Sequence, residues 1–491
     1  MAIGVDMKLR YFSLMTLHCN LLPSGDSRFI TARCCFKSIA FLATVLSLTM
    51  ILASCGEKPT HRVQIYNDLT TTLIKQMPLQ HSAPPNAVSG ASNFDKAILQ
   101  AVEANDRFRA AISLEREMMA NIGVAKSARR WQVTGNSTVG GVREQGGTKP
   151  SNTTTGIAGS IQASQLIYDG GESVANINSA TAKAVGARIE RIIIGNELAL
   201  EAARGWIDVW QYEEKLDLLN ARSKEMEKVV SQIERMASNG MIDRAALDSV
   251  LRKVVAITLE ETRLQADLSQ SKVRFSRFFN EHPSDLAMPT GLVTMSDARA
   301  QLDSWQEAPD LQRSVIELIV AQNAVSAAKA AFKPKAKFQA GVMSPMQEGE
   351  STDASLGLLL EYKFSDGGRR RSQVNVAEAQ VDSAAAKLLD AQRSFKAEMD
   401  ATAHKLKAIE LSMPLLARQI TITAAGAKTA KTQLTTGQAN LNQVIEAQIE
   451  SYRAEDAQIT MYAENLELQF LIASRTGLLG RLIGLSADVA E

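Results

Sequence analysis

The sequence alternates between apolar and polar residues over two stretches, LGLLLEYKF and GIAGSIQASQLIY. A period of two residues is that of a β-strand with one apolar face. Each stretch is preceded by a second run of strand character, which is the signal of a hairpin. The pattern therefore predicts strand pairs over 131–168 and 336–364. The apolar set of the later stretch is Leu356, Leu358, Leu360, Tyr362 and Phe364.

Other segments repeat apolar residues in steps of three and four, the spacing of one helix face in a coiled coil. One such seam runs from Leu216 to Ala237, and a second runs from Leu247 to Leu268. Between them Gly240 can adopt the left-handed conformation that ends a helix and lets the chain reverse. The pattern predicts an antiparallel coiled-coil hairpin whose first helix, about 172–238, is on the order of 100 Å long.

The order of elements occurs twice along the chain at a constant spacing. Asp-Gly-Gly triplets begin at Asp169 and Asp366, and 366 − 169 = 197. The glycines at the two chain reversals, Gly240 and Gly437, are separated by the same distance, because 437 − 240 = 197. A further seam, Leu406 to Leu434, leads into the second reversal. Equal spacing at both landmarks predicts a duplicated half-protein.

Each half is predicted to hold a helix, a strand pair and a coiled-coil hairpin. The opening helix of the first half is expected from Phe94 to about Arg130 with Asn93 as its cap, and that of the second half over 307–332. The predicted boundaries are 93–282 for the first repeat, 283–306 for a linker, 307–475 for the second repeat and 476–491 for a C-terminal tail.

The N-terminal region differs from the repeats in composition. An apolar run over 38–54 follows several basic residues, so 1–54 is predicted to be a signal sequence, and 1–27 looks like an over-long start. Residues 55–92 contain four of the twelve prolines and are predicted to form an extended tether.

All four cysteines lie within the first 55 residues, and a body without thiols suits an oxidising compartment. The last of them, Cys55, ends a Leu-Ala-Ser-Cys stretch that resembles the bacterial lipobox. The resemblance implies that Cys55 carries a lipid anchor, and glycine at position 56 favours the outer membrane. The alternative is a chance match within an uncleaved anchor helix.

Neither the net charge nor the polar motifs indicate a catalytic, metal-binding or nucleic-acid-binding site. The 54 basic and 53 acidic residues leave a net charge of +1, which offers no case for a nucleic-acid partner. The five histidines are scattered without metal-ligand spacing. Two S-x-x-K matches, at 269–272 and 326–329, lie in predicted helices and have no K-T-G partner. The prediction is a protein that is not an enzyme and uses no cofactor or metal.

The strands fit a membrane barrel, with apolar side chains toward lipid and polar side chains toward water. A half-buried sheet in a soluble domain would have the same local pattern. Only four strands are available per chain, while lipid forbids an open sheet edge and such barrels need about eight strands or more. Several chains must therefore contribute to one barrel.

The repeated order of helix, strand pair, Asp-Gly-Gly, long helix, glycine turn and return helix resembles the TolC-like outer membrane efflux family. The recurrent stretches are Ala308–Leu311, Asp366–Arg371 and Thr436–Gln448, within a match over about 94–475. The resemblance implies a mainly α fold with membrane β, in which four strands per chain form a barrel shared by a homotrimer in the outer membrane. It also implies a periplasmic helical tunnel that meets an adaptor (membrane fusion) protein and an inner-membrane pump.

The resemblance gives roles to two groups of residues. At the barrel-to-tunnel bends, glycine would permit the bend and aspartate would cap the helix. At the coiled-coil tips, the chain would dock the adaptor. The bend residues are Asp169, Gly170, Gly171, Asp366, Gly367 and Gly368, and the tip residues are Gly240, Asp243, Leu247, Gly437, Asn440 and Val444.

Two further features leave alternatives open. Arg369, Arg370 and Arg371 lie at a helix N-terminus, which the helix dipole disfavours; they either face lipid phosphates or form a solvated basic surface. The positions that match the family's gating aspartate, tyrosine and arginine are Ala246, Leu434 and Ala439, whose side chains cannot hydrogen-bond, so a gate held by charge is in doubt.

The function implied is the outer membrane channel of a tripartite efflux pump or a type I secretion system. The alternative is a periplasmic coiled-coil adaptor or scaffold lipoprotein. An adaptor should carry one hairpin inserted in a small β domain, whereas this sequence predicts two hairpins, each after its own strand pair. The exported substrate and the class of pump do not follow from the sequence.

Overall fold

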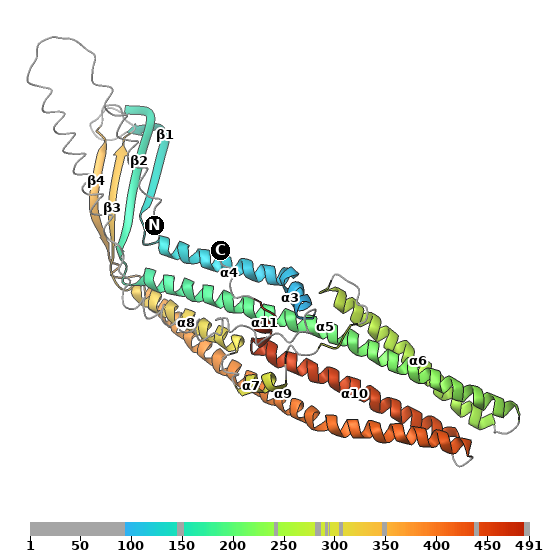
Figure 1. Ribbon diagram of the computed structural model, residues 1–491. Coiled ribbons are helices and arrows are strands. Elements are labelled where there is room, and N and C mark those ends of the chain that lie inside the picture. Colours follow the sequence, from blue (N-terminus) through green and yellow to red (C-terminus); the bar gives the residue numbers. More distant parts are fainter. Residues whose placement is uncertain are drawn as a thin grey trace, which may run out of the picture. The chain divides into compact units, whose positions relative to one another are not determined.

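A computed structural model describes residues 94–144, 152–239, 244–279, 286–289, 293, 295–303, 308–345, 351–436 and 441–485. The chain divides into two units, 1–73 and 74–491, and every described residue belongs to the second. The predicted signal sequence, the tether and Cys55 lie outside the described residues. The second unit is mainly helical and has one antiparallel sheet (Figure 1), as the predicted fold class requires.

The sheet contains β1 (Gln132–Glu144), β2 (Asn152–Tyr168), β3 (Lys335–Ser344) and β4 (Asp353–Glu361) in that spatial order. Three of these strands lie within the ranges predicted from the alternation, and β3 begins one residue before its predicted range. The β2–β3 pairing joins the two repeats, so each chain supplies one continuous four-stranded sheet. Tyr362 and Phe364, which the alternation placed with the strand, lie just beyond the end of β4.

The register places like side chains on one face across all four strands, because directly paired residues of neighbouring strands point to the same side. Ile161 pairs with Gly135 and with Val342, and Leu358 pairs with Phe338. We call this side the apolar sheet face; its large exposed members are Val133, Val139, Ile157, Ile161, Val342, Leu356, Leu358 and Leu360. The opposite side is the polar sheet face, which includes Thr134, Asn136, Ser160, Gln162 and Gln339.

The opening helix of the first repeat is not continuous, which corrects the expectation of one helix from Phe94 to about Arg130. It is divided into α3 (Phe94–Ala104) and α4 (Asp106–Ser127). Asn105 between them is extended, and its side-chain oxygen accepts a hydrogen bond from the Arg107 N–H at 2.9 Å. Asparagine offers the backbone this alternative to an internal helix bond, so it starts a new helix instead.

Two helices of 67 residues, α5 (Glu172–Ser238) and α9 (Arg369–Thr435), dominate the fold. Each reverses into a return helix, α6 (Arg244–Ser276) or α10 (Leu441–Arg475). Pro414 lies inside α9 without ending it. The remaining helices in the described residues are α7 (Met295–Asp303), α8 (Pro309–Ala330) and α11 (Leu478–Leu482).

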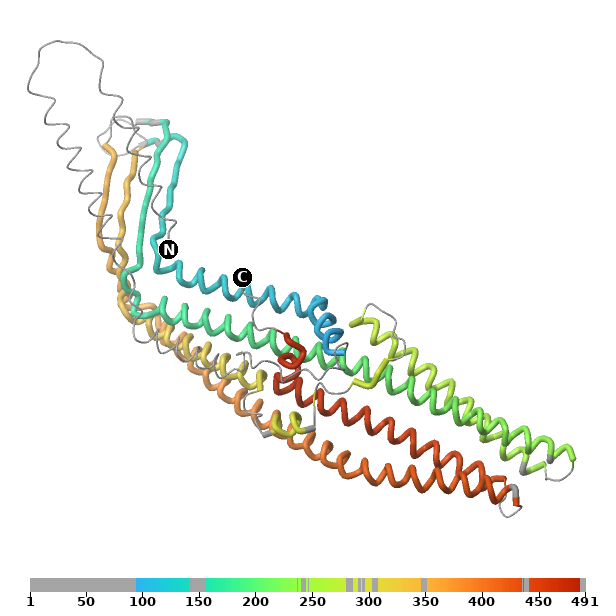
Figure 2. The backbone as a smooth tube through the Cα atoms, in the orientation of Figure 1, coloured from blue at the N-terminus to red at the C-terminus, as the bar shows by residue number. Residues whose placement is uncertain are grey.

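The helices form a wall in which α5 lies in the interior. Near the sheet the packing order is α4, α5, α8, α9, and toward the tips it is α6, α5, α10, α9, as Figure 2 shows. The strands follow the same order, since α4 leads into β1 and β4 leads into α9. One edge of this wall is therefore β1, α4 and α6, and the other edge is β4 and α9.

A hydrophobic core midway along the wall joins α3, α5, α10 and α11. Phe94 lies against Trp206 and Phe470, with ring centroids 5.2 and 5.7 Å apart. Nearer the tips, a second cluster holds the two hairpins together through Met226, Ile233, Val250, Leu441 and Ile445. The residues predicted as coiled-coil seams supply most of these contacts.

Candidate channel wall and coiled-coil tips

Both Asp-Gly-Gly triplets have the same backbone conformation between the sheet and a long helix. Gly170 and Gly171 have φ values of 71° and 100°, and Gly367 and Gly368 have values of 66° and 87°. These angles lie in the left-handed region, which side chains with a β-carbon rarely adopt. The sequence signal, two glycines after an aspartate, therefore corresponds to a required backbone shape.

The aspartate of each triplet caps the following helix. Asp169 accepts hydrogen bonds from the N–H groups of Gly171 at 3.0 Å and Ser173 at 2.6 Å. Asp366 accepts equivalent bonds from Gly368 at 3.2 Å and Arg370 at 3.1 Å. Each carboxylate satisfies N–H groups that a helix leaves without a partner in its first turn.

The caps also set the acidity of the two carboxyls. Partial burial acts to raise the pKa of Asp169, but the hydrogen bonds from Ser173 and Gly171 and the charge of Arg129 outweigh it and lower the pKa. Desolvation likewise acts to raise the pKa of Asp366, and the hydrogen bonds and charge of Arg370 lower it overall. Both groups are thus held in the ionised form that the cap needs.

Arg370 resolves part of the question about the three arginines. Its guanidinium donates to Asp366 at 2.8 Å and to the carbonyl oxygens of Lys363 at 2.7 Å and Ala331 at 3.3 Å. It also lies over the Phe332 ring at 5.0 Å and is buried. Neither alternative from the sequence fits Arg370, because it ties the start of α9 to the ends of β4 and α8. Arg369 and Arg371, in contrast, are exposed.

Exposed aromatic residues lie at or just beyond the strand ends that face the helices, a feature that the sequence reasoning missed. Such residues form girdles at the membrane–water interface of outer membrane barrels. The sequence could have indicated this feature, because these aromatic residues lie close to the ends of the predicted strands. The five are Trp131, Tyr168, Phe332, Tyr362 and Phe364.

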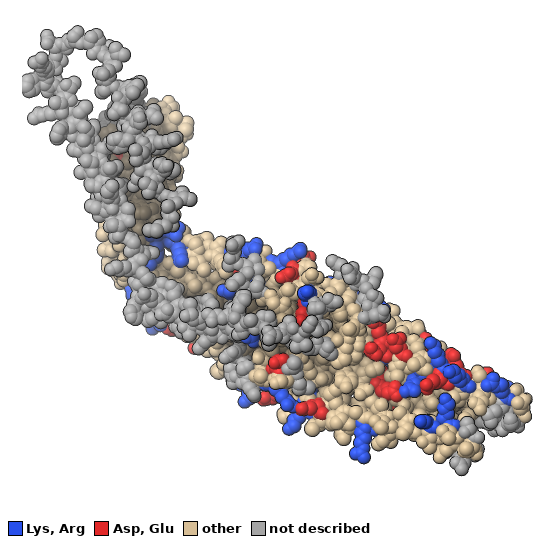
Figure 3. Space-filling model, viewed as in Figure 1, with Lys and Arg blue, Asp and Glu red and all other residues tan. Residues whose placement is uncertain are grey.

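The two edges of the wall expose large apolar side chains, whereas its interior helices do not. Among the described residues, α5, α8 and α10 expose none. The exposed members are Leu114, Met119 and Val124 on α4, Leu251, Val255, Leu259 and Val273 on α6, and Val376, Leu389, Leu411, Leu415 and Ile422 on α9. Lys, Arg, Asp and Glu are spread over the helical part, and few charged atoms mark the visible part of the sheet (Figure 3).

Two of the six predicted tip residues, Leu247 and Val444, lie in the described part of the chain. Gly240, Asp243, Gly437 and Asn440 lie outside the described residues. Leu247 is half-buried against the cluster that joins the two hairpins. Val444 is fully buried, at 0% exposure, so its side chain faces the core and is not presented to a partner.

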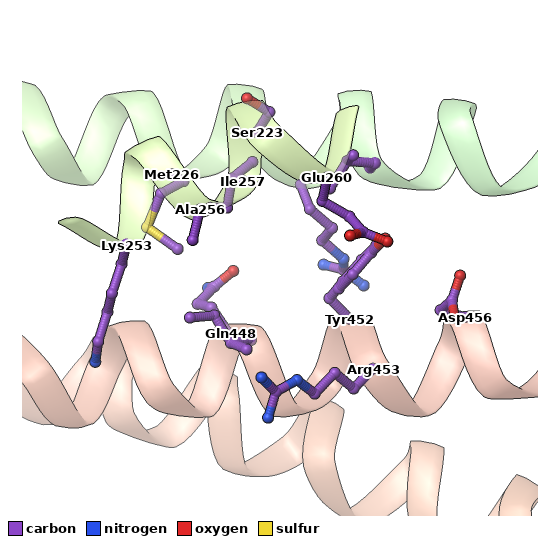
Figure 4. Close-up of a pocket in the computed structure, with 13 residues that line it drawn as sticks. Ser223, Met226, Lys253, Ala256, Ile257, Glu260, Gln448, Tyr452, Arg453 and Asp456 are labelled. Atoms are coloured by element: carbon purple, nitrogen blue, oxygen red, sulfur yellow. The ribbon is translucent and has the colours of Figure 1, made fainter. Parts of the chain in front are cut away.

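A groove of about 540 Å³ lies between α5, α6 and α10 near the tips (Figure 4). Its rim carries ion pairs, Lys253 with Glu446 at 3.1 Å and Arg222 with Glu455 at 2.5 Å. Burial raises the pKa of Tyr452, and the neighbouring carboxylates Asp456 and Glu260 raise it further. Sequence spacing could not indicate this groove, because its three walls are distant along the chain.

None of the described helices combines the length and the apolar character needed to cross a bilayer. In the same part of the chain, no three His, Cys, Asp or Glu side chains are placed to hold a metal ion.

Comparison with solved structures shows the same architecture in outer membrane channels. The outer membrane protein VceC of Vibrio cholerae superposes with a TM-score of 0.69 at 14% identity, over 79% of this chain and 96% of that one. The CmeC outer membrane channel of Campylobacter jejuni gives 0.69 at 13%, over 81% and 90%. The MtrE outer membrane channel of Neisseria gonorrhoeae, in its open state, gives 0.65 at 16%, over 81% and 91%. No curated protein matched the sequence.

Residues 303–470 match the family model of outer membrane efflux proteins. The chain has the TolC-like fold of these outer membrane channels. The family match covers the second repeat, while the structural matches extend the efflux fold over both halves. The resemblance inferred from the repeated Asp-Gly-Gly and glycine-turn pattern is thereby confirmed.

Proposed function

We propose that this protein is the outer membrane exit channel of a tripartite efflux pump or a type I secretion system, and that it works as a homotrimer. The observation that carries the proposal is the pair of apolar wall edges, which end in the edge strands β1 and β4. The fold shared with solved outer membrane channels supports the location in the outer membrane with a large periplasmic portion.

The edges explain why more than one chain is needed. The backbone groups of β1 and β4 along the sheet edges require partners in lipid, and one four-stranded sheet cannot close on itself. If the α9 edge of one copy meets the α4 and α6 edge of the next, the contact is head-to-tail and closes into a ring. Three copies would give twelve strands and a continuous helical tunnel.

The rival proposal, a periplasmic adaptor, fits the structure less well. An adaptor should have one hairpin within a small β domain. Here two hairpins follow two strand pairs that share one sheet, and that sheet has an exposed apolar face. This arrangement favours the channel.

Replacing Val255 and Leu259 on α6 by aspartate is expected to convert the trimer into monomers. In a single chain Val255 is 68% exposed and Leu259 is 70% exposed. Each aspartate would remove about 1.5–3 kcal/mol of apolar burial at the contact between chains and would bury a carboxylate there. Mass measurement in detergent tests this. The control is Lys228→Asp, at an exposed position of the interior helix α5, which should leave the trimer intact. A trimer that survives both α6 changes would refute the edge contact.

At the tips, we propose that adaptor docking depends on the turn shape at Gly240 and Gly437 rather than on charge. Replacing Gly437 by valine should abolish export while leaving the trimer in the membrane, because a β-carbon would strain the turn if its φ is positive. Asp243→Ala should have little effect, because exposed ion pairs contribute about 0–1 kcal/mol. A transport assay in cells that carry the matching pump decides. Full export by the Gly437 variant, or its loss in the Asp243 variant, would contradict the proposal.

The N-terminal proposals rest on the sequence alone. We propose that residues 1–54 are a signal sequence and that Cys55 carries a lipid anchor. The anchor would hold the tether at the membrane that contains the barrel.

A further inference from the structure

The charged side chain of Lys337 lies on the polar sheet face and forms no ion pair with the described residues. Its position has a consequence for permeation that rests on the proposed channel function. Lys337 is on β3, paired with Leu166 of β2 on one side and with Leu359 of β4 on the other. It lies on the side opposite Phe338, whose pairing with Leu358 belongs to the apolar sheet face. If the apolar face meets lipid, Lys337 points into the water-filled barrel.

The neighbours of Lys337 favour an extended ammonium. Leu166 and Leu359 flank its aliphatic stem, while Lys337 itself is exposed. Lysine commonly lays its stem on apolar neighbours and keeps its charge in water. The charge is therefore directed away from the wall.

The nearby carboxylates are already engaged. Glu172 pairs with Lys335 at 2.6 Å, and Glu361 pairs with Lys363 at 3.6 Å. Asp169 and Asp366 cap helices, as described above. Among the described residues, no ion pair involves Lys337. The other charges on this face of β3 and β4 are Lys335 and Glu361, which belong to these pairs, and Asp353 at the opposite end of the sheet.

We propose that Lys337 forms a ring of three positive charges inside the barrel near its helix-facing end, and that this ring favours the passage of anionic solutes. Twelve strands spaced about 4.8 Å apart and tilted by about 40° give a backbone radius on the order of 12 Å. The lysine stems shorten the distance from the ammonium groups to the axis. That distance is comparable to the Debye length of about 10 Å at 0.1 M salt, so the ring acts on permeating ions at low salt and is screened at 1 M.

The chloride-to-potassium permeability ratio tests this directly. It is measured on the purified trimer in a planar bilayer of zwitterionic lipid under a potassium chloride gradient. Replacing Lys337 by glutamate should lower the chloride-to-potassium permeability ratio by about two- to fivefold when mean salt is near 0.1 M. Lys337→Gln should give a smaller change in the same direction. Both differences should vanish near 1 M salt. The control Arg143→Gln removes a positive charge from the opposite sheet face and should leave the ratio unchanged.

A second experiment adds the charge after folding, which separates selectivity from stability. The chain has no cysteine after Cys55, so Lys337→Cys creates one reactive thiol in the body. A cationic methanethiosulfonate reagent should restore the anion preference of the assembled channel, and an anionic reagent should reverse it. Phe338→Cys, one residue away on the apolar face, should show no change in permeability with either reagent.

The outcomes separate the ring from the channel itself. If the Lys337→Glu channel conducts with the wild-type permeability ratio at low salt, or if the thiol at position 337 does not react from the aqueous phase, the ring is refuted while the channel function stands. If the wild-type protein forms no conducting trimer, the proposed function fails first.

Discussion

Replacing Gly170 by alanine is expected to destabilise the folded protein by about 2–5 kcal/mol. The left-handed φ of 71° costs about 1–2 kcal/mol for a residue with a β-carbon. The site is also closed, because an added β-carbon would lie 2.5 Å from the Lys333 Cβ and 2.9 Å from the Ala330 carbonyl oxygen. Relieving such overpacking typically costs about 1–3 kcal/mol more.

The duplicated bend provides a matched control. Gly367 is the equivalent residue, since 367 − 170 = 197, and its φ is 66°. No atom lies within 4 Å of the β-carbon that Gly367→Ala would add, so only the conformational cost of about 1–2 kcal/mol is expected. Thermal unfolding of the two purified variants compares them. Equal losses of stability would show that the contact with Lys333 does not constrain the first bend.

Replacing Glu115 by leucine is expected to destabilise the protein by about 3–5 kcal/mol, because it removes the carboxylate that is paired with a buried guanidinium. Glu115 on α4 accepts a hydrogen bond from the Arg191 Nε on α5 at 2.5 Å, and their side chains are only 9% and 2% exposed. The pair lies between two helices of the wall. Its loss should therefore separate α4 from α5 next to the sheet.

Two variants test whether the loss of the Glu115–Arg191 charge pair causes the expected loss of stability. Changing Arg191 to methionine together with Glu115→Leu removes both charges and should recover most of the lost stability, since well-packed apolar pairs replace buried ion pairs at little cost. Glu197→Ala breaks a pair with Arg107 at 3.4 Å whose side chains are 43% and 50% exposed, and should cost about 0–1 kcal/mol. Chemical denaturation provides the comparison. A double variant as unstable as Glu115→Leu alone would point to packing rather than charge.

Local sequence patterns predicted several features of the fold. The Asp-Gly-Gly triplets predicted two bends because only glycine adopts the left-handed conformation freely and aspartate caps a helix, and both effects act within five residues. The steps of three and four predicted the long helices, since helical periodicity is a local property. The break at Asn105 was missed because a single side chain there outweighs an otherwise helical pattern.

The sequence by itself determined the duplication, the kinds of elements and the apolar face of each strand, because these depend on neighbours along the chain. Only the tertiary structure decided which of those elements meet. The burial of Arg370 against Ala331 and Lys363, and the packing of Leu441 and Ile445 against Met226, depend on contacts between distant segments. The same holds for Lys337: alternation assigns it to a face, but only strand register reveals leucines on both sides and no partner for its charge among the described residues.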